Sequence, residues 1–308
     1  GSGAAAASKD FPLSMRARDL ASYLFLAVTW GLSFLVLVKV VAAFGWVGAV
    51  AFRCLLAGAA LVVMGKALQR GFSFSLGWRP YAIVGATTVA GQLIGLSYGT
   101  PLIGTAMAAI LVAAIPLFSM VISQLWGLDR MTPSRLAGLF IGMAGIVLLV
   151  GFTAVPVTPR FLLACAACLF ASFSAAFRSN YASLHLRTAG SMEVAAGSFL
   201  AGGLMTLPLL AAVPGPAMPG PADFVYLGIL GLVMSALTYA IYFRLVAAIG
   251  PTRAISVEFA VTVVAVLVGA LLLKEPLTPV QLFGAAIIVI GCMLVLDVLP
   301  PRPRMRRS

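Results

Sequence analysis

Long apolar segments separated by short polar ones run along almost the whole chain. A helix needs about 20 mostly apolar residues to cross the hydrocarbon core of a bilayer. Ten segments of about this length can be delimited: 20–41, 45–67, 80–99, 104–127, 133–151, 160–178, 191–212, 222–243, 251–273 and 277–298. Almost nothing is left between them for a soluble domain. The pattern predicts an all-α integral membrane protein with ten transmembrane helices.

The chain repeats itself at a spacing of 146 residues. The sequence DRMTPSRLAGLFIGMAGIVLLV at 129–150 aligns with EPLTPVQLFGAAIIVIGCMLVL at 275–296. Each half holds five predicted spans, an odd number, so the two copies should lie on opposite sides of the membrane. We therefore expect residues 20–151 and 159–298 to form two inverted five-helix repeats around a central cavity, as in many secondary transporters.

The repeated residues indicate helix packing rather than chemistry. The Thr132 hydroxyl can cap a helix by accepting a bond from an orphan backbone N–H, and Pro133 fits the first helical position. Gly138 lets a neighbouring helix approach closely. The matching positions in the second copy are Thr278, Pro279 and Gly284.

The composition agrees with a membrane protein, because 62% of the 308 residues are hydrophobic and only 9% are charged. The formal net charge is +12. If the N-terminus is cytoplasmic, 16 of the 20 Lys and Arg, Arg178 among them, fall in cytoplasmic segments. Only Lys39, Arg160 and Lys274 fall outside, and Arg53 alone lies well inside a span. This asymmetry places both termini in the cytoplasm and explains the positive charge without a nucleic-acid partner.

The two ends of the chain differ from the apolar spans. Residues 1–19, which begin GSGAAAASKD, are expected to form a disordered tail. The basic tail 299–308 is expected to meet anionic lipid headgroups at the cytoplasmic face of the membrane.

The sequence offers little support for an enzyme or a cofactor. Cys54, Cys165, Cys168 and Cys292 all lie in apolar spans and are interpreted as packing residues, and the sole histidine, His185, lies in a loop. We therefore expect no metal site. An intramembrane enzyme would need convergent catalytic groups, and the phosphate-binding pattern GxxxxGK[ST] is absent, so ATP is not the expected energy source.

Several short motifs resemble a known family. TWGLSF in the first span, FRCLLAG in the second and the paired turns DRMTP and KEPLTP resemble the EamA branch of the drug/metabolite transporter superfamily, and within it the YddG-type bacterial amino-acid exporters. The resemblance covers about residues 20–298 and departs from the family at Leu128-Asp129, where Gly-Glu is common. It implies an inner-membrane exporter. The spans that it places around a central cavity are 20–41, 80–99, 104–127, 160–178, 222–243 and 251–273.

Candidate substrate-binding residues lie on these spans. Aromatic rings can enclose an apolar side chain, and a buried amide can bond a carboxylate or an ammonium. Glu258 could bind an ammonium, carry a proton or simply line an inner vestibule. Ordinary packing or interhelical bonding is the alternative for the aromatic residues and the amide. The candidates are Trp30, Gln92, Phe173, Tyr239, Tyr242 and Glu258.

Other residues are candidates for gating or structure. A charge at the depth of Arg53 needs a partner or water; bonds between helices are the favoured interpretation, and a substrate carboxylate or an outer gate the alternative. Arg53 and Glu258 differ in depth by about 10 Å, estimated from the helix rise, so no salt bridge between them is expected. Tyr98 is either a gating or an interfacial residue. Glu193 is expected to cap its own helix, and Pro116 to kink its span.

Together these observations favour a secondary exporter of small amphipathic metabolites, above all amino acids, including aromatic and apolar ones, that works by alternating access. The expected partners are this substrate and the lipid bilayer, and a monomer is plausible. Multidrug efflux of cationic compounds, with Glu258 as the cation site, is the main alternative, and another metabolite carrier of the same superfamily is a further one. A nucleotide sugar would need several cations for its pyrophosphate. The residues alone do not separate a carrier from a channel or a sensor.

Overall fold

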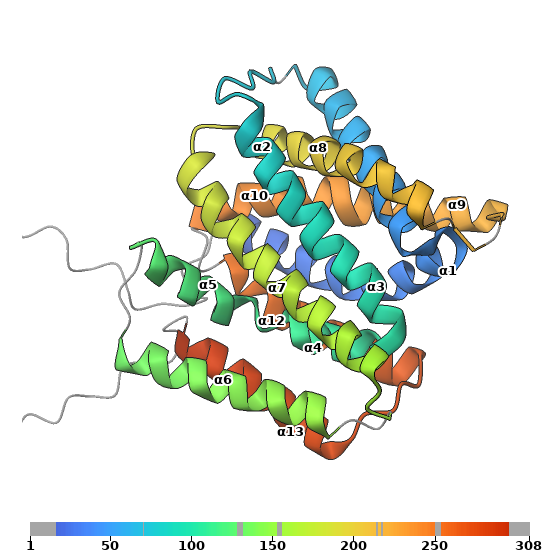
Figure 1. Cartoon of the computed structure of the whole chain (residues 1–308). Coiled ribbons are helices and arrows are strands. Elements are labelled where there is room, and N and C mark those ends of the chain that lie inside the picture. Colours follow the sequence, from blue (N-terminus) through green and yellow to red (C-terminus); the bar gives the residue numbers. More distant parts are fainter. Residues whose placement is uncertain are drawn as a thin grey trace, which may run out of the picture.

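A computed structural model describes residues 17–69, 71–127, 132–152, 156–213, 215–216, 218–249 and 254–295. The predictions for residues 1–16, for the Leu128-Asp129 turn and for the tail at 299–308 lie outside this part of the chain. Within it, all regular structure is helical (Figure 1), and three segments, named η1 to η3 here, are π-helical. The elements are α1 (Ala17–Ala67), α2 (Trp78–Gly85), η1 (Ala86–Leu93), α3 (Ile94–Ile103), α4 (Thr105–Val112), α5 (Ile115–Leu125), α6 (Pro133–Gly151), α7 (Pro159–His185), α8 (Ser191–Ala212), α9 (Pro221–Gly228), η2 (Ile229–Leu237), α10 (Thr238–Ile249), α12 (Val257–Leu267), η3 (Val268–Leu272) and α13 (Pro279–Val295).

The apolar helices agree with a membrane protein. In the described part of the chain, seven helices are long and apolar enough to cross a membrane, and two shorter apolar helices cover 257–272 and 279–295. The first two predicted spans form the single element α1, which starts at Ala17 and has a non-helical break at Gly45, with φ 74° and ψ 164°. The count of ten spans therefore stays a prediction.

The predicted kink at Pro116 is confirmed. The fourth predicted span is divided into α4 and α5, and Pro116 is the second residue of α5.

The N-terminus of α4 follows Gly104, whose φ of 90° favours glycine. There Glu275 accepts hydrogen bonds from the backbone N–H groups of Thr105 at 2.7 Å and Ala106 at 2.9 Å. A carboxylate from the far end of the chain thus caps α4.

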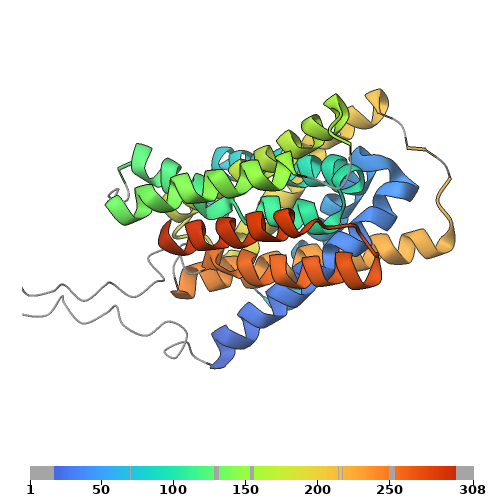
Figure 2. The same ribbon diagram turned by 90° about the horizontal axis from the view of Figure 1, so that it is seen from below.

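The two copies of the repeated sequence pack against each other as α6 and α13, side by side along one edge of the bundle (Figures 1 and 2). A Cβ added to Gly138 would lie 2.6 Å from the carbonyl oxygen of Gly291, and one added to Gly145 would lie 2.8 Å from that of Gly284. The helices therefore run antiparallel, and their backbones approach as closely as glycine allows.

The predicted caps are confirmed. The Thr132 hydroxyl accepts from the N–H of Arg135 at 3.3 Å, and the Thr278 hydroxyl accepts from that of Gln281 at 3.1 Å. The Gln281 side chain accepts in return from the backbone N–H of Thr278 at 2.9 Å, which completes a capping box.

Candidate functional site

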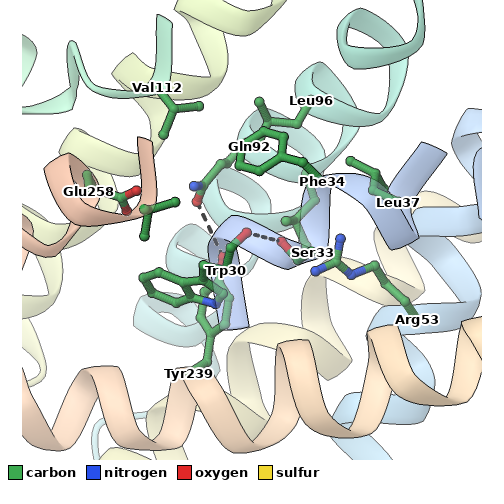
Figure 3. Close-up of a pocket in the computed structure, with 12 residues that line it drawn as sticks. Trp30, Ser33, Phe34, Leu37, Arg53, Gln92, Leu96, Val112, Tyr239 and Glu258 are labelled. Atoms are coloured by element: carbon green, nitrogen blue, oxygen red, sulfur yellow. Dashed lines mark hydrogen bonds between the residues drawn. The ribbon is translucent and has the colours of Figure 1, made fainter. Parts of the chain in front are cut away.

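A small cavity lies where α1, η1, α3, α4, α10 and α12 converge, lined on several sides by the predicted candidates (Figure 3). Its volume is about 50 Å³, enough for a few water molecules but not for a metabolite. An amphipathic molecule could enter only after the surrounding helices move apart. The lining residues are Trp30, Ser33, Phe34, Leu37, Arg53, Gln92, Leu93, Leu96, Val112, Tyr239, Glu258 and Val261.

Gln92 sits in η1 and is 7% exposed. Its side-chain oxygen accepts a hydrogen bond from Nη1 of Arg178 at 2.8 Å and faces the hydroxyl of Tyr239 at 3.5 Å. The same Nη1 donates to the Tyr239 hydroxyl at 3.2 Å. One guanidinium nitrogen therefore joins an amide and a phenol on two different helices.

Arg178 is 2% exposed and lies on α7, which packs against η1 and α3. The rings of Tyr239 and Tyr242 face its guanidinium carbon, with centroids at 5.1 and 5.6 Å. Such contacts stabilise a cation most strongly when it is desolvated. Arg178 thus lies buried within α7, which continues to His185, and not in a loop beyond the helix as the charge count assumed.

Trp30 and the tyrosines of α10 form an aromatic wall. The Trp30 ring lies 5.4 Å from Tyr239 and 5.3 Å from Tyr242 between centroids, and its indole N–H donates to the Thr238 hydroxyl at 3.0 Å. Tyr242 is 2% exposed and shares a 3.1 Å hydrogen bond with Ser179. Tyr242 therefore supports Trp30 from behind, and Trp30 and Tyr239 line the cavity.

Arg53 is held by an adjacent π-helical segment. Its Nε and Nη2 donate to the Ser235 hydroxyl of η2 at 3.0 and 2.8 Å, and Ser235 donates to the carbonyl of Leu230 at 2.7 Å. The expected bonding between helices is therefore present. Arg53 also lines the cavity, with its guanidinium group pointing into it (Figure 3), although its span is not among those that the family resemblance places around the centre.

Glu258 is 6% exposed in the first turn of α12 and faces the cavity. Its carboxylate has no hydrogen bond or ion pair with any other described residue, Arg53 included. Arg178 lies near enough for an electrostatic interaction. Glu258 is thus a buried acid without a direct partner, an arrangement that is costly unless water or a ligand supplies one.

Three other predicted residues lie elsewhere. Phe173 is 40% exposed and faces outward beside Phe118 and Phe170, at centroid distances of 6.0 and 6.3 Å. Tyr98 is half-buried, packs edge-on against Trp46 at 5.6 Å and is not among the lining residues. The third is Glu193, at the start of α8.

Glu193 does not cap its own helix. The N-cap of α8 is Gly190, whereas the Glu193 carboxylate accepts bonds from the Tyr81 hydroxyl and from the backbone N–H of Ser73, the latter at 3.0 Å. It therefore joins the start of α8 to α2 and the loop before it.

Arg178 is not among the residues predicted for the site, although the sequence of α7 carries a pattern that indicates which face of the helix holds it. Small side chains at Ala171, Ala175 and Ala182 are buried on the face that holds Arg178, and large ones such as Phe173 face outward. In a bilayer, small and polar residues mark the helix face that meets other helices. The spacing of the alanines places Arg178 on that face.

Comparison with known proteins agrees with this architecture. The profile of the EamA-like transporter family matches residues 20–151 and 162–297. The uncharacterized inner membrane transporter YedA of Escherichia coli K12 is 31% identical over 190 residues, and the alignment spans 61% of each chain. A probable terminal-alkyne amino-acid exporter of Streptantibioticus cattleyicolor is 28% identical over 220 residues, which cover 70% of this chain and 71% of the relative.

A solved crystal structure has the same fold. It superimposes with a TM-score of 0.66 at 18% sequence identity and covers 92% of this chain and 99% of its own.

Proposed function

The chain belongs to the EamA-like transporter family, so it is a membrane transporter and not an enzyme, and we propose that it is a secondary exporter of amino acids, aromatic and apolar ones included. One observation carries this proposal. The cavity combines aromatic rings with the donors of Arg53 and Gln92 and with the unpaired acid Glu258. Donors can bind a carboxylate, Glu258 can bind an ammonium, and Trp30 and Tyr239 can enclose an apolar side chain.

The names of two relatives support amino-acid export and an inner-membrane location. The name of the Streptantibioticus cattleyicolor relative describes an exporter of an amino acid, and that of YedA places it in an inner membrane. We propose the inner membrane for this chain too, with both termini in the cytoplasm, as the asymmetry of its Lys and Arg predicts.

We further propose ten spans arranged as two inverted repeats. The break at Gly45 divides α1 into two arms, each long enough for a span, and the two shorter apolar helices complete the count. Gly138 aligns with Gly284 in the repeat and Gly145 with Gly291, and the contacts pair Gly138 with Gly291 and Gly145 with Gly284. This exchange of partners is expected for two copies related by a two-fold axis. The site between them would open alternately to each side.

Counterflow in proteoliposomes tests the proposed function. Vesicles loaded with an unlabelled amino acid should accumulate the same labelled amino acid, with saturation, in the absence of ATP. A panel of aromatic, apolar, charged and polar amino acids defines the substrate range. Accumulation of hydrophobic cations, but of no amino acid, would instead favour efflux of cationic compounds with Glu258 as the cation site. Flux without saturation or counterflow would indicate a channel.

A further inference from the structure

We propose that Arg178 is a positioning residue that turns the amide of Gln92 so that its NH₂ group faces the cavity. The site then prefers ligands that carry a carboxylate. This inference rests on the proposed function and assigns a specificity role to a residue outside the cavity lining.

The orientation of the amide follows from the chemistry of its partner. A guanidinium group can only donate hydrogen bonds. Because Nη1 of Arg178 lies 2.8 Å from one end of the Gln92 amide, that end must be the oxygen. The Tyr239 hydroxyl reaches the same oxygen at 3.5 Å. A flipped amide would set NH₂ against a guanidinium group and leave two buried donors facing each other.

Arg178 cannot easily leave this position. It is buried against the rings of Tyr239 and Tyr242. The helix that carries it lies close to the helix of Gln92: a Cβ added to Gly95 would lie 2.6 Å from the carbonyl oxygen of Ala167 on α7. The close contact between the two helices therefore keeps the guanidinium group beside the amide.

The consequence is a cavity with two chemically different parts. With its oxygen engaged, Gln92 offers only its NH₂ group to a ligand. Figure 3 shows the amide between Glu258 and Tyr239, with its oxygen bonded to Tyr239. Arg53, which also lines the cavity, can only donate. Glu258 is the acid among the lining residues. A ligand with a carboxylate satisfies the donors, whereas an amine without one leaves them unpaired.

The isosteric substitution Gln92→Glu tests this role directly. It keeps an oxygen for Arg178 and Tyr239 but replaces the NH₂ group with a second oxygen. We would measure the competition of L-phenylalanine and of phenethylamine, its decarboxylated analogue, with counterflow by the full-length protein in liposomes. The preference for phenylalanine should fall at least tenfold, the size of one hydrogen bond to a charged group. Arg178→Met frees the amide to rotate and should reduce the same ratio.

Folding and function are separated by controls. Melting temperature and gel filtration report folding, and if Arg178→Met fails to fold, Gln92→Glu decides the question. Phe173→Leu, which changes an outward-facing ring, should keep the wild-type ratio. Folded Gln92→Glu protein with an unchanged ratio would overturn the inference and leave the proposed function standing. A wild-type protein that transports no amino acid would overturn both.

Discussion

Trp30 and Phe173 show how similar residues in similar spans acquire different roles. Both are large aromatic residues on helices expected near the centre. Trp30 faces the cavity and donates its indole N–H to Thr238, whereas Phe173 is 40% exposed on the outer face of α7. Only the rotation of each helix about its axis separates the two cases.

We expect Trp30→Ala to weaken substrate affinity by about tenfold or more, because removal of a large apolar contact costs about 2 kcal/mol. Phe173→Ala removes a comparable ring from the outer face and should leave affinity within about twofold, as expected for a surface substitution. Concentration-dependent counterflow measures both, and gel filtration checks folding. Equal effects of the two substitutions would contradict the assignment of the cavity.

The sequence predicts part of this site and misses part of it, for physical reasons. Polar and amphipathic side chains stand out within an apolar span, because burying them is costly unless they have a partner. The residues recognisable in this way are Trp30, Gln92, Tyr239 and Glu258. Arg178 is missed because a charge close to the end of an apolar segment looks like the start of a loop. The helix continues because the cation is bonded and covered by aromatic rings, and these contacts come from residues far away in the sequence.

At the scale of the elements, glycine decides where helices meet. The glycines of α6 and α13 stand backbone to backbone, and those of α3 stand against α7. Gly151 and Gly228 lie in helices without such a neighbour, because a Cβ at either would meet no atom within 4 Å. The repeated glycines therefore indicate that a neighbouring helix approaches closely, but they do not indicate which helix it is.

Gly291→Ala should lower stability by about 1–3 kcal/mol, the cost of overpacking a tight contact. The new Cβ would lie 2.6 Å from the carbonyl oxygen of Gly138, and backbone cannot rotate away as a side chain can. The matched change Gly228→Ala has open space and helical dihedral angles, so it should be neutral or stabilising by up to about 1 kcal/mol. Thermal unfolding in detergent compares them. An unchanged melting temperature for Gly291→Ala would refute the packing argument.

The π-helical segments were not predicted, because ATTVAGQL at 86–93 and ILGLVMSAL at 229–237 carry no pattern that distinguishes them from ordinary helix. These two of the three π-helical segments nevertheless each supply one polar group near the site: Gln92 from η1, and from η2 the serine that holds Arg53. Widened turns of this kind often occur at functional sites.

At the scale of the whole molecule, the distribution of Lys and Arg predicts how the chain is oriented in the membrane. With the N-terminus in the cytoplasm, the connection between α8 and α9 is expected on the opposite side of the inner membrane. Met218 in this connection is 97% exposed. Cys54, Cys165, Cys168 and Cys292 are all buried, so native thiols should contribute little background in a labelling experiment.

A Met218→Cys protein should therefore react with a membrane-impermeant thiol reagent in intact cells, or in cells whose outer barrier alone has been opened. The unsubstituted protein is the control for native thiols. Reaction only after the inner membrane is permeabilised would invert the proposed orientation and with it the assignment of both termini.

The contact between α6 and α13 has the form that a two-fold axis would give, because Gly138 meets Gly291 and Gly145 meets Gly284. In a two-fold symmetric dimer, every substitution in such a surface acts twice. In a single chain the two sides can differ, and here they do: Gly142 makes room for Leu117, while Ile288 occupies the aligned position and packs against Gly145. Within one chain a substitution on one side of this contact leaves the other side unchanged, so the two sides can vary independently of each other.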